Sequence, residues 1–268
     1  MKMQAVLGQF IPGNSVVHRL DARFKLALTA WLVVVLFFAN SFVTYGVMLF
    51  AVVMAAALSR IKPRMLLRAL RPMLFLMAFT LFFNVFLNAE EPLWWSWWKL
   101  SLGPAGLRMG LFMGARLMLL VTASSLLTFT TSPLDLTDGL ERLLNPLKVI
   151  KFPAHELAMM MSIALRFIPT LAEEVDRIIK AQQARGADFE SGNIIRRAKA
   201  LVPVLVPLFA STFRRAEDLA MAMEARCYQG GEGRTRMKVL KSHRRDWLAL
   251  AAMALLTGGL VICRIYAI

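Results

Sequence analysis

Five apolar stretches, each close to twenty residues long, constrain the fold of this chain more than any other feature of its sequence. They cover residues 24–40, 42–58, 73–89, 107–131 and 247–265. A hydrocarbon core of roughly 30 Å needs about that many residues in a helix, and a backbone in lipid has to form its hydrogen bonds within the segment. The chain is therefore expected to be an all-α polytopic membrane protein with about five transmembrane helices.

Composition and flanking charge agree with this expectation. Of the 268 residues 58% are hydrophobic, which is more than a soluble domain of this length can usually bury. The first apolar stretch follows several charged residues and lacks a small-residue cleavage site before a mature domain. It is therefore interpreted as a retained helix and not as a signal peptide.

The distribution of lysine and arginine indicates the orientation in the membrane. These residues gather in the N-terminal arm, in the turn after the second stretch and in residues 132–246, which the positive-inside rule places in the cytoplasm. The expected location is the bacterial plasma membrane, with the N-terminus cytoplasmic. Residues 90–104, with four tryptophans, are then an outer loop, and the tryptophans are interfacial anchors or, alternatively, a ligand cage. This topology and contact with anionic lipids explain the net charge of +15, so nucleic acid is not expected as a partner.

The apolar stretches divide the chain into three predicted parts. Residues 1–131 form a membrane domain with four transmembrane helices, residues 132–246 a cytoplasmic domain, and residues 247–268 a C-terminal transmembrane helix. The cytoplasmic domain begins with a short amphipathic helix, for which Ser132 is the expected N-cap and Pro133 the first helical residue.

Two long amphipathic patterns follow in the cytoplasmic part, over residues 154–185 and 194–226, and both end in the same way. Their last residues are Ala184, Arg185 and Gly186 in the first pattern and Ala225, Arg226 and Cys227 in the second. An arginine at a helix C-terminus is favoured by the helix dipole, so each end is a simple helix stop on one interpretation. On the other, because the alanine spacing is repeated, each end is a narrow tip whose guanidinium binds a carboxylate of another protein.

The two ends resemble the transmembrane T component (EcfT family, CbiQ-like and BioN-like) of energy-coupling factor (ECF) transporters, which are vitamin-type ABC importers. The similarity includes "SIALRFIPTL", "GADF", "GEGRTR", "LDARFKL" and "TSPLDLTDGLERLLNPLK", and so extends over most of the chain. It implies a non-catalytic scaffold that links two cytoplasmic ATPase subunits, of the EcfA and EcfA′ types, to a substrate-binding S component for uptake of vitamins or other micronutrients. It also implies that the long cytoplasmic helices are coupling helices whose six terminal residues dock on the ATPases, which hold the ATP and Mg while this chain binds no cofactor.

The sequence departs from the family pattern at two positions. Cys227 stands where the family usually has glycine, which leaves the geometry of the second tip open, and Ala22 stands where it tends to have proline. We interpret Cys227 as a small replacement, with a reactive thiol as the alternative. Pro169, Pro203 and Pro207 are candidate hinges for a movement driven by the ATPases, or else static kinks.

Other chemistry is absent from the sequence motifs. There is no G-x-x-x-x-G-K-[ST] loop, no H-E-x-x-H and no Cys/His cluster, so neither a catalytic nor a metal site is predicted. Of the charges in or near the apolar stretches, Arg108 is expected to snorkel, and Arg166 lies in an apolar helix. Arg116 is expected to pair with a carboxylate or, alternatively, to line an ion or substrate path. The alternative functions are a T component dedicated to a metal ion (cobalt or nickel) or to biotin, and, less favoured, a stand-alone secondary transporter or a membrane enzyme.

Overall fold

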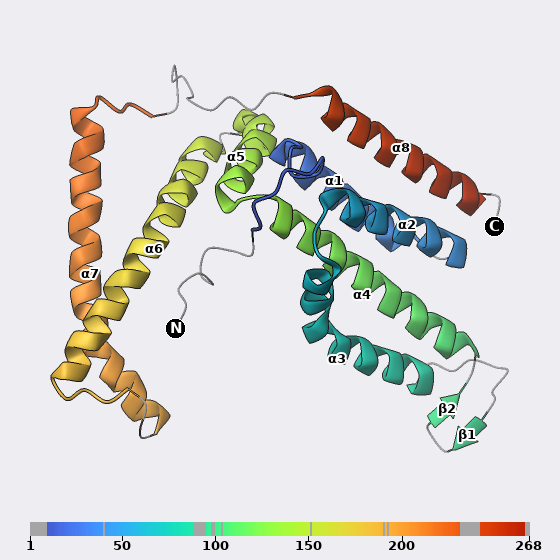
Figure 1. The fold of residues 1–268 in the computed structure, drawn as a ribbon, viewed down its shortest axis with the longest axis horizontal. Coiled ribbons are helices and arrows are strands. Elements are labelled where there is room, and N and C mark those ends of the chain that lie inside the picture. Colours follow the sequence, from blue (N-terminus) through green and yellow to red (C-terminus); the bar gives the residue numbers. More distant parts are fainter. Residues whose placement is uncertain are drawn as a thin grey trace. The chain divides into compact units, whose positions relative to one another are not determined.

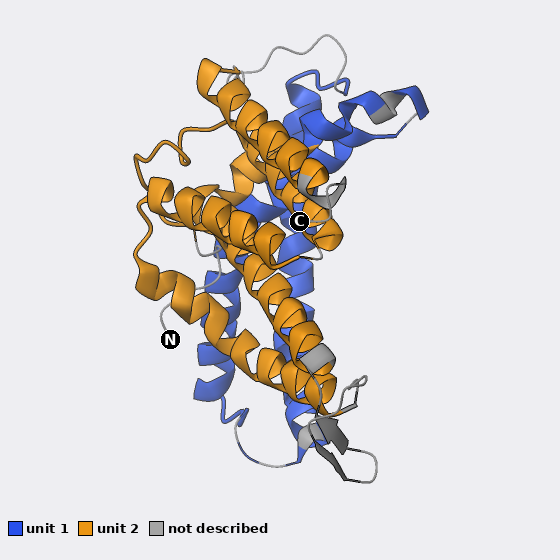
Figure 2. Cartoon of the chain, turned by 90° about the vertical axis from the view of Figure 1, so that its right-hand side faces the viewer, with its two compact units in different colours: residues 1–8, 141–238 blue, residues 9–140, 239–268 orange. Residues whose placement is uncertain are grey.

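A computed structural model describes residues 10–39, 41–87, 95–97, 100–102, 104–150, 152–189, 191, 193–230 and 242–265. Except for two strands of three residues, the regular structure in these ranges is helical, which confirms the predicted all-α class. The chain forms two compact units, shown in Figure 2: a larger unit of residues 9–140 and 239–268, and a smaller unit of residues 1–8 and 141–238. The three-part division predicted from the sequence stays a prediction.

The larger unit contains five long helices, labelled in Figure 1. They are α1 (Ala22–Phe38), α2 (Phe42–Ser59), α3 (Pro63–Leu87), α4 (Pro104–Thr130) and α8 (Arg244–Ile265). Between α3 and α4, strand β1 (Trp95–Trp97) pairs antiparallel with β2 (Leu100–Leu102), with Ser96 opposite Ser101. The rest of the predicted outer loop lies outside the described residues.

Among the described residues, four helices are long and apolar enough to cross a membrane, over residues 42–59, 63–86, 106–130 and 244–262. The predicted polytopic membrane protein is thereby confirmed. The first predicted span, residues 24–40, corresponds to α1, a helix of 17 residues that is not among the four. The third span differs at its start: α3 begins at Pro63, ten residues before the predicted residue 73, because proline is favoured at the first helical position and Pro72 is accommodated inside the helix.

The core of the larger unit is an apolar cluster between α1, α2, α4 and α8. It consists of Val35, Leu36, Ala39, Tyr45, Met48, Val52, Leu119, Leu126 and Leu260. Helix α3 packs on α4 at Gly110, where a Cβ atom would lie 2.9 Å from Leu81 Cδ1. Small residues at such a position let two membrane helices approach closely.

A polar junction in the larger unit joins the beginnings of α1 and α8 to the end of α4. The buried Lys25 donates from Nζ to the carbonyl oxygens of Thr130, at 2.9 Å, and His18, at 3.1 Å. Asp246, which is 1% exposed, accepts hydrogen bonds from the backbone N–H groups of Asp21 and His243. Because these groups belong to helix ends, the junction supplies partners that helix ends otherwise lack.

Helix α5 (Pro133–Leu144) begins as the sequence predicts, since Ser132 Oγ accepts a hydrogen bond from the backbone N–H of Asp135 at 3.1 Å. Its residues 133–140 belong to the larger unit, where Gly139 lies close to α1: a Cβ there would be 3.1 Å from Ala22 Cβ. The two quoted segments "LDARFKL" and "TSPLDLTDGLERLLNPLK" are thus neighbours in the fold.

The smaller unit contains the end of α5, the 3₁₀ helix η2 (Asn145–Ile150), α6 (Ala154–Ala184) and α7 (Ile194–Ala225). Both long helices occur where the sequence predicts them. They run in opposite directions, as Figure 1 shows, and an ion pair of 2.6 Å joins Glu174 of α6 to Arg215 of α7. His155 Nδ1 lies 2.9 Å from Glu141 Oε1 and so connects α6 to α5.

Candidate functional site

The first predicted tip is a well-formed helix end. Arg185 is the C-cap of α6, and Gly186 follows it in the left-handed conformation with φ +87°. The backbone N–H of Gly186 donates to the carbonyl of Gln183, and that of Ala187 donates to the carbonyl of Gln182, both at 2.9 Å. These are the two hydrogen bonds of the Schellman motif, so the chain leaves the helix at once after Arg185.

The second tip has the same backbone with a different residue. Arg226 follows the last residue of α7, and Cys227 takes the left-handed conformation with φ 55°. The N–H of Cys227 donates to the carbonyl of Glu224 at 2.8 Å, and that of Tyr228 to the carbonyl of Met223 at 3.1 Å. The geometry that the sequence left open is therefore a second Schellman motif, with cysteine at a position where an L-residue costs about 1–2 kcal/mol.

All six predicted tip residues are exposed. Among the described residues, neither Arg185 nor Arg226 has a carboxylate oxygen within 4 Å. A guanidinium carries five N–H donors in a planar fork, which matches a carboxylate better than any other cationic side chain does. Each tip therefore presents an unpaired fork between small neighbours, Ala184 and Ala225, and the tips lie at opposite ends of the antiparallel helix pair (Figure 1).

The three predicted hinge prolines lie inside continuous helices, Pro169 in α6 and Pro203 and Pro207 in α7. A proline has no N–H, so the carbonyl four residues before it loses its helical partner. For Pro207 that carbonyl belongs to Pro203, and it accepts a hydrogen bond of 3.4 Å from the side-chain amide of Gln182 in α6. Figure 1 shows α7 changing direction in its first half, where both prolines lie.

Sequence analysis missed Gln182, which connects the last turn of α6 to the proline segment of α7. The spacing of four residues between Pro203 and Pro207 is a signal that could have found the unpaired carbonyl. No sequence pattern identifies its donor, because Gln182 lies 21 residues away in another helix. Whether the prolines act as hinges stays a prediction.

The arginines of the membrane helices have other partners than expected. Arg116 donates from Nε to the Tyr45 hydroxyl at 3.1 Å and from Nη2 to the carbonyl of Ala39, the C-cap of α1, at 3.3 Å. The expected carboxylate partner is wrong for the described part of the chain: the partially negative C-terminus of α1 accepts the cation instead. Arg108 lies over the ring of Phe112, 5.3 Å from its centroid, and Arg166 is exposed on α6.

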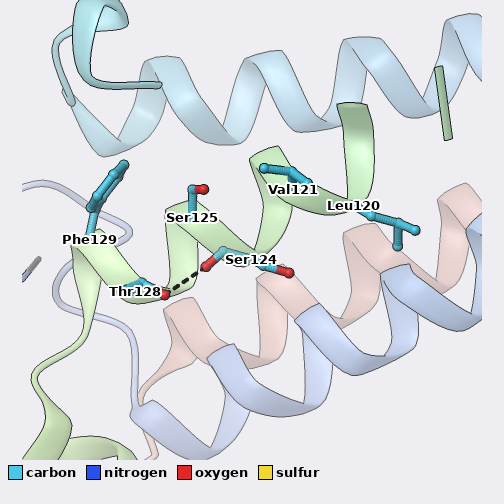
Figure 3. Close-up of a pocket in the computed structure, with 6 residues that line it drawn as sticks. All are labelled: Leu120, Val121, Ser124, Ser125, Thr128 and Phe129. Atoms are coloured by element: carbon cyan, nitrogen blue, oxygen red, sulfur yellow. Dashed lines mark hydrogen bonds between the residues drawn. The ribbon is translucent and has the colours of Figure 1, made fainter. Parts of the chain in front are cut away.

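A groove of about 270 Å³ follows one face of α4 and is shown in Figure 3. It is lined by Leu120, Val121, Ser124, Ser125, Thr128 and Phe129. The Thr128 hydroxyl donates to the carbonyl of Ser124 at 3.0 Å and is therefore engaged within its own helix. Within the described ranges no three His, Cys, Asp or Glu side chains are grouped so that they could hold a metal ion. The "GEGRTR" segment lies outside these ranges.

Comparison with known proteins gives consistent matches. Residues 13–237 match the family model described as cobalt transport protein. The chain is 52% identical to the energy-coupling factor transporter transmembrane protein EcfT of Acidaminococcus fermentans over 92% of each chain. It is 49% identical to the protein of the same name from Thermosediminibacter oceani, over 97% of this chain and 98% of that one, and 48% identical to that of Brevibacillus brevis, over 96% and 97%.

Proposed function

The chain belongs to the family of energy-coupling factor transporter transmembrane proteins, and we propose that it is the scaffold that joins two cytoplasmic ATPase subunits to a substrate-binding S component. The observation that carries this proposal is the pair of exposed arginine tips with the same backbone geometry. The relatives' name places them in an energy-coupling factor transporter, which is an assembly that couples an energy source to transport. Two tips of one geometry suit two ATPase subunits of related structure.

Each tip would bind by presenting its guanidinium to a carboxylate in a groove of one ATPase. The small residues on either side, Ala184 and Gly186 in the first tip and Ala225 and Cys227 in the second, would let the tip enter without steric conflict. A bidentate contact of this kind fixes the direction of the helix as well as its position. The 2.6 Å ion pair between Glu174 and Arg215 supports transmission, since it ties the two coupling helices together between their tips.

The remaining assignments follow from the same proposal. ATP and Mg are held by the ATPase subunits, and this chain is a non-catalytic subunit with its N-terminus in the cytoplasm. A movement of the ATPases would then change the arrangement of α6 and α7, with Pro169, Pro203 and Pro207 as candidate bend points. A component dedicated to a metal ion is the second candidate, because the matched family model is described as cobalt transport protein.

Co-purification of the chain with its ATPase pair tests the proposal. We expect the Arg185→Glu and Arg226→Glu double variant to retain at least tenfold less ATPase than the wild type, because removal of one partner of a buried charge pair already costs about 2–5 kcal/mol. A matched control reverses Arg177 and Arg214, which are exposed on the same two helices away from the tips. Equal retention by the tip variant and the control would mean that the arginines only end their helices.

A further inference from the structure

Helix α3 carries one continuous stripe in which arginines are followed by phenylalanines. The stripe consists of Arg64, Arg68, Arg71, Phe75, Phe79, Phe82 and Phe86. Successive members are three or four residues apart on either side of Pro72, so the arginines share one face of the first turns of α3 and the phenylalanines share one face of the turns that follow. The rings form a ladder in two pairs, Phe75 with Phe79 at 6.4 Å and Phe82 with Phe86 at 4.6 Å between centroids, and the neighbouring Phe83 links the pairs through its contacts with Phe79 and Phe82.

This stripe faces away from the rest of the larger unit. The packing face of α3 contains Met77 and Leu81, whose side chains lie against Gly114 and Gly110 of α4, and it is on the opposite side of the helix. Phe75 is 79% exposed, and the three arginines of the stripe are exposed as well. Apart from the half-buried Phe86, the stripe is therefore an outer surface of this unit.

In the part of the chain that the structure describes, the arginine end of the stripe has no compensating charge. Residues 41–87 contain no aspartate or glutamate. Within the described part of the chain, Arg64, Arg68 and Arg71 have no carboxylate oxygen within 4 Å. The N-terminus of α3 begins at Pro63 and adds its own partial positive charge. An anion is thus the ligand that this end would attract.

The dimensions of the stripe match one leaflet of a bilayer. At 1.5 Å per residue, Phe75 to Phe86 covers roughly 16 Å, which is about half of a hydrocarbon core of roughly 30 Å. Arg64 to Arg71 covers a further 10 Å or so, a length that extends from the hydrocarbon boundary through the layer of headgroups. The transition from arginine to phenylalanine lies at Pro72, inside a helix that is long and apolar enough to span.

We propose that this stripe of α3 is a binding site for an anionic phospholipid. The phosphate is held by the forked guanidinium groups of Arg64, Arg68 and Arg71, and the acyl chains lie along the phenylalanine ladder. Guanidinium groups bind phosphate oxygens in pairs, and clusters of basic residues at the membrane surface attract anionic lipid headgroups. The proposal does not depend on the docking of ATPase subunits.

The test measures binding of dioleoyl phosphatidylglycerol to the full chain in detergent by native mass spectrometry, against dioleoyl phosphatidylcholine. Each positive charge at an anionic surface contributes about fivefold, so Arg64→Gln, Arg68→Gln and Arg71→Gln together should weaken binding of the anionic lipid about a hundredfold. A control with the same loss of charge replaces Arg196, Lys199 and Arg214, which are exposed on α7, by glutamine and should change binding less than threefold. A variant with lysine in place of all three arginines keeps the charge, and its affinity for the anionic lipid should fall only a few-fold. This variant tests the proposal even if the glutamine variant does not fold.

Three results would overturn the proposal. The first is equal affinity of the wild type for the anionic and the zwitterionic lipid. The second is equal weakening in the stripe variant and the α7 control. The third is displacement of the lipid by millimolar glycerol phosphate, which would indicate a site for soluble phosphate.

Discussion

The two tips offer a direct test of backbone strain, because they share one geometry but differ in the residue at the left-handed position. Gly186 has φ +87° and Cys227 has φ 55°. A Cβ atom added at Gly186 would meet no atom within 4 Å, so a substitution there is affected by the backbone conformation alone. We predict that Gly186→Ala weakens the first cap and that Cys227→Gly strengthens the second.

The magnitude follows from the cost of the left-handed conformation. An L-residue pays about 1–2 kcal/mol there, whereas glycine pays almost nothing for the conformation and about 0.5–1 kcal/mol for its greater freedom in the unfolded chain. Gly186→Ala should therefore destabilise the first cap by about 1 kcal/mol, and Cys227→Gly should stabilise the second by a similar amount. A difference of this size is about fivefold in the population of the open helix end.

Hydrogen exchange of the capping amides is the appropriate assay, since local opening at a helix end is separate from global unfolding. The reporting amides are those of Gly186 and Ala187 in the first tip and those of Cys227 and Tyr228 in the second. After correction for intrinsic rates, the first pair should exchange about fivefold faster in Gly186→Ala, and the second about fivefold slower in Cys227→Gly.

Cys227→Ala is the control, because it removes the thiol but keeps an L-residue at the left-handed position. It should leave the exchange of the second pair of amides within about twofold of the wild type. If Cys227→Gly and Cys227→Ala change exchange equally, the thiol and not the backbone controls this helix end, and the strain argument fails.

Three further predictions concern the larger unit. Asp246→Ala removes the acceptor of two backbone N–H groups, those of Asp21 before α1 and His243 before α8, and should cost about 2–3 kcal/mol, seen as a lower Tm in detergent. Asp246→Asn should lose less because it keeps one oxygen, and equal Tm values for the two variants would contradict this. Arg116→Met leaves the carbonyl end of α1 and the Tyr45 hydroxyl without their donor and should cost about 2 kcal/mol in the same assay, whereas an unchanged Tm would show that water replaces the guanidinium. Gly110→Val places a Cβ atom 2.9 Å from Leu81 Cδ1 and should therefore separate α3 from α4. The separation should be seen as a loss of cross-linking between cysteines introduced on the two helices. Gly46→Val is the control and should be tolerated, because a Cβ atom at Gly46 would have no atom within 4 Å.

The helices could be predicted from the sequence because their signals are local. Ser132 as an N-cap and the ends of α6 and α7 depend on residues within one turn of the boundary, and the structure confirms them. Hydropathy places the start of α3 ten residues late, because the first turns of the helix contain Arg64, Arg68 and Arg71. A helix that begins in charged residues is longer than its apolar part.

The partners of single polar groups could not be predicted in the same way. Arg116 bonds to groups 71 and 77 residues away, and Gln182 bonds across to α7. Such pairs arise because a buried donor takes whichever acceptor the packing brings near, and the free carbonyls of helix ends are as suitable as carboxylates. A sequence shows which groups need a partner, but tertiary packing decides which partner they obtain.

The comparison of the two tips also bears on why the arginines are there. In a Schellman motif the residue that matters most for ending the helix is the one in the left-handed conformation, which is usually glycine. If the two tips served only to end their helices, glycine is therefore the residue expected to occur in both. Yet the second tip has Cys227 and not glycine at that position, while both tips have arginine, although neither Arg185 nor Arg226 contributes more than its backbone to the caps in the described structure. The repeated feature is thus the side chain that the helix end does not require, which favours recognition of a partner over a simple helix stop.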